Sequence, residues 1–241
     1  MASIDTATAP RTYHAHRERQ RRRILEAAEK LFDERGIDRT TMAEITTAAG
    51  IRTSTMYQYF ANKDEVVWAI LGETMADSAT RIKEAVEPAK TGLEKIAALL
   101  EFMAGELSRN PAKVRFMAQF DAMYAREWPA ERLLALEGQI SIRGFDGFGA
   151  LIQEGIADGS LRSDLDPGLT LHAVLNAVIG AQRRLASLGS RVELEYGQPI
   201  DRLLRETIRV ILLGLRATAE DPAAPGGVRG RKVRNKKRRS S

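Results

Sequence analysis

The chain of 241 residues is long enough for one large or two small domains, and its hydrophobic fraction of 44% suffices for a buried core. The absence of cysteine excludes a disulfide framework and a zinc–thiolate site. The longest segment without a charged residue, 167–182, is too short to span a membrane, and the polar residues 1–12 do not form a signal peptide. We therefore expect a cytoplasmic protein.

The net charge of +5 is unevenly distributed along the chain. Residues 221–241 carry a net charge of +7, residues 1–66 of +1, and residues 67–220 of −3. A basic terminal block is typical of segments that contact nucleic acid, and the alternative is a solvated, solubilising tail. A tail that contacts nucleic acid would strengthen that binding without sequence preference. If so, deleting residues 222–241 reduces the salt dependence of binding.

Apolar residues recur at helical spacing along almost the whole chain, and no segment alternates with the period of a β-strand. A stripe that includes Ile24, Ala28 and Phe32 predicts a helix over 17–35, which Gly36 ends. The sequence Thr41-Met42-Ala43-Glu44 predicts a capping box at the start of a second, short helix. Further helices are predicted over 53–59, 63–87, 93–108, 111–126, 130–158, 169–187 and 200–218. We therefore expect an all-α fold that begins with a three-helix head.

Residues 41–60 carry the strongest functional signal. Two short helices joined by a turn at Gly50-Ile51-Arg52 form a helix-turn-helix pattern, in which the second helix enters the major groove of DNA. That helix offers hydroxyls, an amide and phenols, which bind bases and phosphates. Met56 and Phe60 lie four residues apart and are assigned to its inward face.

These residues resemble those of a known family. The stretches 48–51 (Ala-Ala-Gly-Ile), 55–60 (Thr-Met-Tyr-Gln-Tyr-Phe) and 62–65 (Asn-Lys-Asp-Glu) are similar to the signature of tetracycline-repressor (TetR) family transcription regulators. The resemblance covers about residues 18–65. It implies a homodimer that represses transcription until a small molecule enters a helical domain behind the DNA-binding head.

On this basis the chain divides into four parts. We expect a basic flexible arm (1–16), a helix-turn-helix domain (17–66), a helical ligand-binding and dimerisation domain (67–219), and a disordered basic tail (220–241). Residues 11–23 contain six arginines, and in the family such a leading arm can reach DNA.

The resemblance also implies DNA-contacting positions. They are Thr41, Thr53, Ser54, Tyr57, Gln58, Tyr59 and Lys63. We add Arg52, whose guanidinium can bind a phosphate or a guanine. Thr41, Tyr57 and Lys63 match positions that contact phosphates, and the rest belong to the recognition helix. Arg52 departs from the usual Ser or Thr that caps this helix, so Thr53 is expected to be the cap. The alternatives are that Tyr57 covers the head's core, that Thr41 only caps a helix, and that Gln58 lies on a solvated face.

An effector pocket is expected among the helices of residues 67–190. The candidate ligand-binding residues are Phe102, Phe116, Phe120, Met123, Tyr124, Trp128, Phe148, His172 and Asn176. These aromatic walls favour an apolar or aromatic effector. The alternative for each aromatic residue is core packing, and for His172 it is a satisfied interior position. No cofactor and no metal site is predicted, because no set of residues has metal-ligand spacing.

The last two predicted helices are expected to form the homodimer. Small residues such as Ala173, Ala177 and Gly180 permit close approach, and Leu204, Ile208 and their apolar neighbours supply area, although they would equally suit an intramolecular core. A two-fold dimer predicts a palindromic operator.

Three other classes of function compete with this reading. The chain lacks a phosphate-binding loop, a nucleophile elbow and a His–carboxylate constellation, so we do not expect an enzyme. A general nucleic-acid-binding protein would bind any duplex, and a regulator without an effector would not respond to metabolites.

Overall fold

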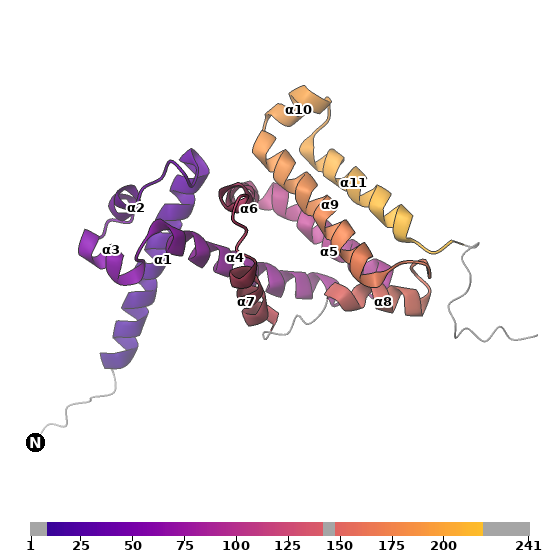
Figure 1. The fold of residues 1–241 in the computed structure, drawn as a ribbon, viewed down its shortest axis with the longest axis horizontal. Helices are drawn as coiled ribbons and strands as arrows, with labels where there is room; N and C mark the ends of the chain where they lie inside the picture. Colours follow the sequence, from indigo (N-terminus) through magenta and orange to yellow (C-terminus); the bar gives the residue numbers. More distant parts are fainter. Residues whose placement is uncertain (1–8, 142–147, 219–241) are drawn as a thin grey trace, which may run out of the picture.

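The computed structural model describes residues 9–141 and 148–218, with the side chains of residues 14–138 and 150–218 (Figure 1). All the regular elements in these residues are α-helices, which confirms the predicted all-α fold. In chain order they are α1 (Ala9–Arg35), α2 (Met42–Ala48), α3 (Thr53–Tyr59), α4 (Lys63–Val86), α5 (Gly92–Arg109), α6 (Pro111–Tyr124), α7 (Ala130–Ser141), α8 (Phe148–Asp158), α9 (Pro167–Leu188), α10 (Arg191–Tyr196) and α11 (Ile200–Leu215).

The helix boundaries differ from the predictions in three places. The arm expected to be flexible is helical from Ala9, and Pro10 lies near that helix start, where its missing N–H costs nothing. The single helix predicted over 130–158 is present as α7 and α8, and residues 142–147 between them lie outside the described residues. The six-residue helix α10 was not predicted. The basic tail beyond residue 218 also lies outside the described residues.

Side-chain caps define the starts of five helices, α2, α4, α5, α6 and α9. The predicted capping box is present: Thr41 Oγ1 accepts a hydrogen bond from the backbone N–H of Glu44, whose carboxylate accepts one from the N–H of Thr41. Thr91 and Glu94 form a second box at α5, and Asn62 caps α4. Since these caps are local in sequence, they anchor the helix boundaries independently of tertiary packing.

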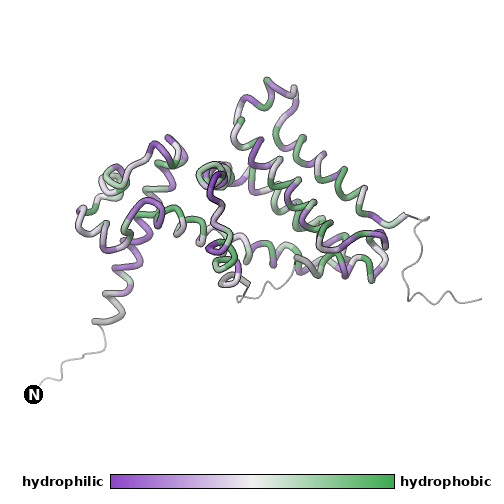
Figure 2. The backbone as a smooth tube through the Cα atoms, in the orientation of Figure 1, coloured by the Kyte–Doolittle hydropathy of each residue, from purple (hydrophilic) through white to green (hydrophobic). Residues whose placement is uncertain are grey.

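The buried side chains form two clusters, one in the head and one in the body. The head cluster joins α1, α2, α3 and the first half of α4, which is largely hydrophobic in Figure 2. The body cluster joins the end of α4 with α5, α8, α9 and α11. Phe116 and Phe120 of α6 belong to the head cluster, so α6 packs against the DNA-binding head although it follows α5 of the body.

Helices α5 and α8 approach each other unusually closely. A Cβ atom on Gly92 would lie 2.3 Å from Cα of Gly155, so neither helix could keep its place with a larger residue there. The side chain of Asp158 accepts a hydrogen bond from the N–H of Gly92 at 2.8 Å and so satisfies the free N-terminus of α5.

Candidate functional site

The helix-turn-helix is held by a small apolar core. Ile45 of α2, Met56 of α3 and Phe60 after it are buried against Ile24 and Phe32 of α1. This places Met56 and Phe60 on the inward face, as predicted. Gly50 has a φ of +61°, a conformation that glycine adopts without strain, and turns the chain between α2 and α3.

The outward face of α3 presents polar side chains to solvent. Thr53, Ser54, Tyr57 and Gln58 are exposed, and Tyr57 is 55% exposed, which removes the alternative that it covers the core. Arg52 is exposed as well and occupies the N-cap position without a side-chain cap bond, so the expected cap by Thr53 is wrong. A groove of about 450 Å³ runs between α2 and α3 beside Thr47, Arg52 and Tyr57. Exposed donors and acceptors on one helix suit the edges of base pairs and the phosphates around them.

Thr41 lies at the exposed N-terminus of α2. Its hydroxyl bonds Glu44, and the pKa of the Glu44 carboxyl is lowered by the hydrogen bonds from Thr41 and by Arg35 nearby. Arg35 Nη1 lies 2.9 Å from Glu44 Oε1 and neutralises this carboxylate at the helix start. Capping and an approach to phosphate are therefore compatible at Thr41.

Two of the predicted DNA contacts are turned toward the protein. The hydroxyl of Tyr59 donates to Gln20 Oε1 at 3.1 Å, and the guanidinium of Arg17 lies 5.8 Å from the Tyr59 ring centre. Lys63 directs its ammonium to backbone carbonyls of residues 37–40. The predictions for Tyr59 and Lys63 relied on their positions in the sequence. Sequence position does not show that the hydroxyl of Tyr59 bonds α1 or that the ammonium of Lys63 bonds the loop before α2.

The predicted pocket residues do not line one cavity. Phe116, Phe120, Met123 and Tyr124 pack into or against the head cluster, while Phe102 packs against the body cluster. Trp128 is 53% exposed and meets Phe120 edge-on at 6.4 Å between ring centres. Apolar spacing identified these residues as inward-facing but did not show which helices they would meet.

The remaining pocket predictions fall on α8 and α9. His172 and Asn176 share a face of α9, as their spacing predicts, but both are exposed, and Asn176 Nδ2 donates to the carbonyl of His172 at 2.8 Å. The alternative of a satisfied interior position for His172 is therefore wrong, because that side of α9 faces outward, and the ligand-orienting role of the pair stays a prediction. The side chain of Phe148 lies outside the described residues.

A polar cleft that the sequence analysis missed lies between the head and the body. It has a volume of about 250 Å³ and is lined by Glu29 of α1, Glu73 and Asp77 of α4, and Lys113 of α6, among others. Burial, together with repulsion from Glu73 and Glu26, raises the pKa of the Glu29 carboxyl. These residues are far apart in sequence, so no local pattern could have joined them.

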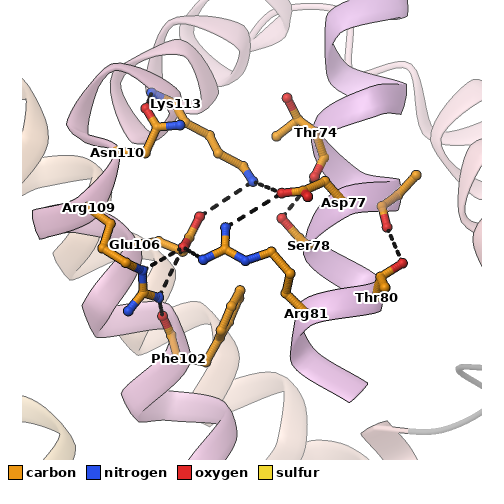
Figure 3. Close-up of polar contacts among 11 residues, drawn as sticks. Thr74, Asp77, Ser78, Thr80, Arg81, Phe102, Glu106, Arg109, Asn110 and Lys113 are labelled. Carbon is orange, nitrogen blue, oxygen red and sulfur yellow. Dashed lines mark hydrogen bonds and ion pairs between the residues drawn. The ribbon is translucent and has the colours of Figure 1, made fainter. Parts of the chain in front are cut away.

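Beside this cleft, a buried carboxylate joins three helices (Figure 3). Glu106 of α5 is 6% exposed and lies 2.9 Å from Arg81 of α4 and 3.4 Å from Lys113 of α6. Arg109 and Asp77 complete the cluster, since Arg109 bonds Glu106 and Asp77 bonds Lys113. The cluster ties the α5–α6 corner to the connecting helix α4.

A second polar network ties the first turn of α4 to α6 and α7. Tyr124 donates to Asp64, accepts from Trp68 Nε1 at 2.8 Å, and has its pKa raised to about 12 by burial and by the bond to Asp64. Arg132 of α7 lies 2.8 Å from Asp64 and 3.9 Å from the Trp68 ring centre. The DNA-binding head is therefore attached to the body by side-chain contacts as well as by the chain itself.

The outer faces of α9 and α11 carry exposed apolar residues among polar ones. Leu169 and Ala177 of α9 are exposed, and Val210 and Leu213 of α11 are 57% and 54% exposed. Leu204 and Ile208, which were expected to supply interface area, are instead buried in the body cluster. In the described part of the chain, no helix is long and apolar enough to cross a membrane.

Known proteins share the sequence and the architecture. Residues 24–70 match the family described as bacterial regulatory proteins, tetR family. The chain is 27% identical over 150 residues to the HTH-type transcriptional repressor KstR2 of Mycolicibacterium smegmatis, a match that covers 62% of this chain and 71% of the relative. It is 24% identical over 159 residues to the fatty acid metabolism regulator protein of Bacillus subtilis, which covers 64% of this chain and 77% of the relative.

The solved structures agree in fold. The transcriptional regulator FadR from Bacillus subtilis, solved in complex with stearoyl-CoA, has a TM-score of 0.61 at 20% identity, covering 80% of this chain and 97% of that one. Fold, exposed helix-turn-helix face and relatives together define a DNA-binding transcription regulator, and not an enzyme. Residues 24–70, which hold the helix-turn-helix, are the part of the chain that matches the tetR family of bacterial regulatory proteins.

Proposed function

We propose that the protein is a ligand-responsive repressor that binds a palindromic operator as a homodimer and releases it when a small apolar effector binds. The observation that carries the proposal is the exposed polar face of the helix-turn-helix. Arg52, Thr53, Ser54, Tyr57 and Gln58 project from it while Met56 anchors the same helix in the core. An α-helix fits the major groove, and an amide such as that of Gln58 forms paired hydrogen bonds with adenine.

The homodimer is proposed to form through α9 and α11. Val210 and Leu213 of α11 and Leu169 of α9 are exposed, and a second copy of the same face would cover them. We expect Leu213→Asp to shift the protein from dimer to monomer in analytical ultracentrifugation, because two carboxylates would be buried at the two-fold contact. A monomeric wild-type protein at micromolar concentration would refute the dimer.

The effector is proposed to be a molecule with a long apolar part. The support comes from two similar proteins: one is a fatty acid metabolism regulator protein, and the other was solved in complex with stearoyl-CoA. Long-chain acyl-CoA thioesters are the first compounds to test, with free coenzyme A as the matched control. A rise in melting temperature and release of DNA are expected with the thioester and not with coenzyme A.

The decisive experiment is the selection of genomic fragments with purified full-length protein at near-physiological salt. A two-fold-related motif among the bound fragments is the expected result, with half-sites one DNA turn, ~34–36 Å, or a multiple apart. Gln58→Ala should then relax the preference at one base pair, at a cost of about 1–3 kcal/mol. Uniform recovery of all fragments would instead indicate a general nucleic-acid-binding protein.

A further inference from the structure

Four side chains from three helices form a closed set of contacts at the start of α4. Asp64 lies in the first turn of α4 and Trp68 lies one turn later. The hydroxyl of Tyr124, from α6, donates to Asp64 Oδ1 and accepts a hydrogen bond from Trp68 Nε1 at 2.8 Å. Arg132 of α7 donates from Nη1 to Asp64 Oδ2 at 2.8 Å, and its guanidinium lies 3.9 Å from the Trp68 ring centre. We call these four residues the α4 clamp.

Helix α7 also reaches α4 through apolar side chains. Leu133 and Leu136 of α7 pack against the head cluster, to which the buried Trp68 belongs. The Leu136 side chain lies so close to α4 that a Cβ atom on Gly72 would be 3.4 Å from it. The apolar contact brings α7 to α4, and the α4 clamp adds bonds with a defined direction.

The first turn of α4 determines where the recognition helix ends. Only residues 60–62 separate α3 from α4, and Phe60 is buried in the head cluster. Lys63, which is predicted to contact a phosphate, directly precedes Asp64. A displacement of this turn would therefore move the end of α3 and Lys63 together. This matters on a two-fold operator, because the two recognition helices of a dimer must keep the separation of the half-sites.

We propose that Arg132 and Tyr124 are positioning residues for operator binding: they hold the first turn of α4 on α6 and α7 and so fix the recognition helix relative to the body. The inference rests on the proposed function, because it concerns how the operator-binding face is held. A contact shifts the population of a head position only by its own stabilising free energy. The side chains of Arg132 and Asp64 are 48% and 39% exposed, so we expect a loss of about threefold to tenfold for each head.

Binding to two duplexes tests the role of Arg132. The probes are a duplex recovered by the genomic selection and a scrambled duplex of the same length and composition. We expect Arg132→Gln to lower operator affinity by about threefold or more and to leave scrambled affinity unchanged. Arg132→Lys should restore part of the loss, because it keeps a charged donor for Asp64.

The charge-matched control is Arg126→Gln, at an exposed arginine between α6 and α7, which should change neither affinity. The salt dependence separates positioning from direct contact. If Arg132→Gln weakens binding to both duplexes and lowers the slope of log affinity against log salt by about 0.9, Arg132 contacts a phosphate. That result would overturn its part of the inference.

Tyr124 tests the same inference without a change of charge. Tyr124→Phe removes the hydroxyl that bonds Asp64 and Trp68 but keeps the aromatic ring that packs on Phe120. We expect the ratio of operator to scrambled affinity to fall by about threefold or more, while Tyr196→Phe, at an exposed tyrosine of α10, leaves it unchanged. A merely structural role would reduce the active fraction and so lower both affinities equally. That outcome, or an unchanged ratio, would overturn the inference.

The indole N–H signal of Trp68 in a nuclear magnetic resonance spectrum reports the α4 clamp without DNA. The chain has two tryptophans, so Trp128→Phe identifies the Trp68 signal in protein with isotope-labelled tryptophan. We expect Tyr124→Phe to move this signal upfield, because the indole N–H loses its acceptor. An unchanged signal would show that the clamp does not form in solution and would overturn the inference.

The proposed function can fail separately from this inference. A wild-type protein that does not distinguish the operator duplex from the scrambled duplex would refute the proposed function. The Trp68 signal would then still decide whether Tyr124 holds the first turn of α4. A wild-type preference for the operator that Arg132→Gln and Tyr124→Phe leave intact would refute the inference alone.

Discussion

Replacing Glu106 with glutamine should destabilise the protein through the charges that it leaves behind. The carboxylate lies within 4 Å of Arg81, Arg109 and Lys113, and an amide at this place would leave three cations facing one another. Breaking a buried ion pair costs about 3–5 kcal/mol. Because the side chains of Arg81 and Arg109 are 38% and 51% exposed and regain water, we expect about 2–3 kcal/mol.

Urea denaturation followed by circular dichroism measures this loss. The midpoint should fall while the slope of free energy against urea stays constant, since the folded and unfolded surfaces are unchanged. The matched control is Glu154→Gln, which removes an exposed carboxylate paired with Lys95 at 2.5 Å and should cost less than about 1 kcal/mol. An equal loss in the two variants would refute the view that burial makes the Glu106 cluster strong.

Three further predictions concern single positions. Gly92→Ala should destabilise the protein by about 3 kcal/mol or more, measured by urea denaturation, because the new methyl group would collide with the backbone of Gly155. Thr91→Ala removes the cap of α5 and should cost about 1 kcal/mol in the same assay. In an alkaline pH jump followed by phenolate absorbance, Tyr124→Phe should abolish a late step near pH 12; detection of that step in the variant would refute the assignment. The raised pKa of Tyr124 stabilises the fold fully below about pH 10, and this contribution is lost as the pH rises toward 12.

The elements with local determinants were predictable from the sequence. The box of Thr41 and Glu44, the cap at Thr91 and the turn at Gly50 each involve residues within a few positions of one another. These determinants are local in sequence, which is why α2, α3 and α5 begin and end close to the predicted residues, whereas α1 begins at Ala9 and not at residue 17.

The choice of partner for each apolar face was not predictable. The stripe of α6 that contains Phe116 and Phe120 satisfies the helical period equally well as a pocket wall or as part of another core. Periodicity gives the direction of a side chain relative to its own helix axis but carries no information about the helix opposite. The same limit applies to Leu204 and Ile208, expected at an interface and found in the body cluster.

The polar sites depended on contacts between distant residues. Lys63 bonds carbonyls of residues 23 to 26 positions away in the sequence. Glu29 of α1 and Lys113 of α6 line the same cleft although they are far apart in the sequence. Composition indicated that the chain has many charges but not which of them would become buried together.

The contribution of α6 to the head cluster has a consequence for recombination between regulators. The family match ends at residue 70, yet Phe116 stacks on Phe32 at 6.3 Å between ring centres, and Phe120 meets Trp68 at 5.3 Å. A chimera that joins residues 1–70 to the body of a relative would receive foreign side chains at positions 116 and 120 and would lose these contacts. The unit that can be exchanged is therefore discontinuous in sequence: the first 70 residues together with the face of α6 that completes their core.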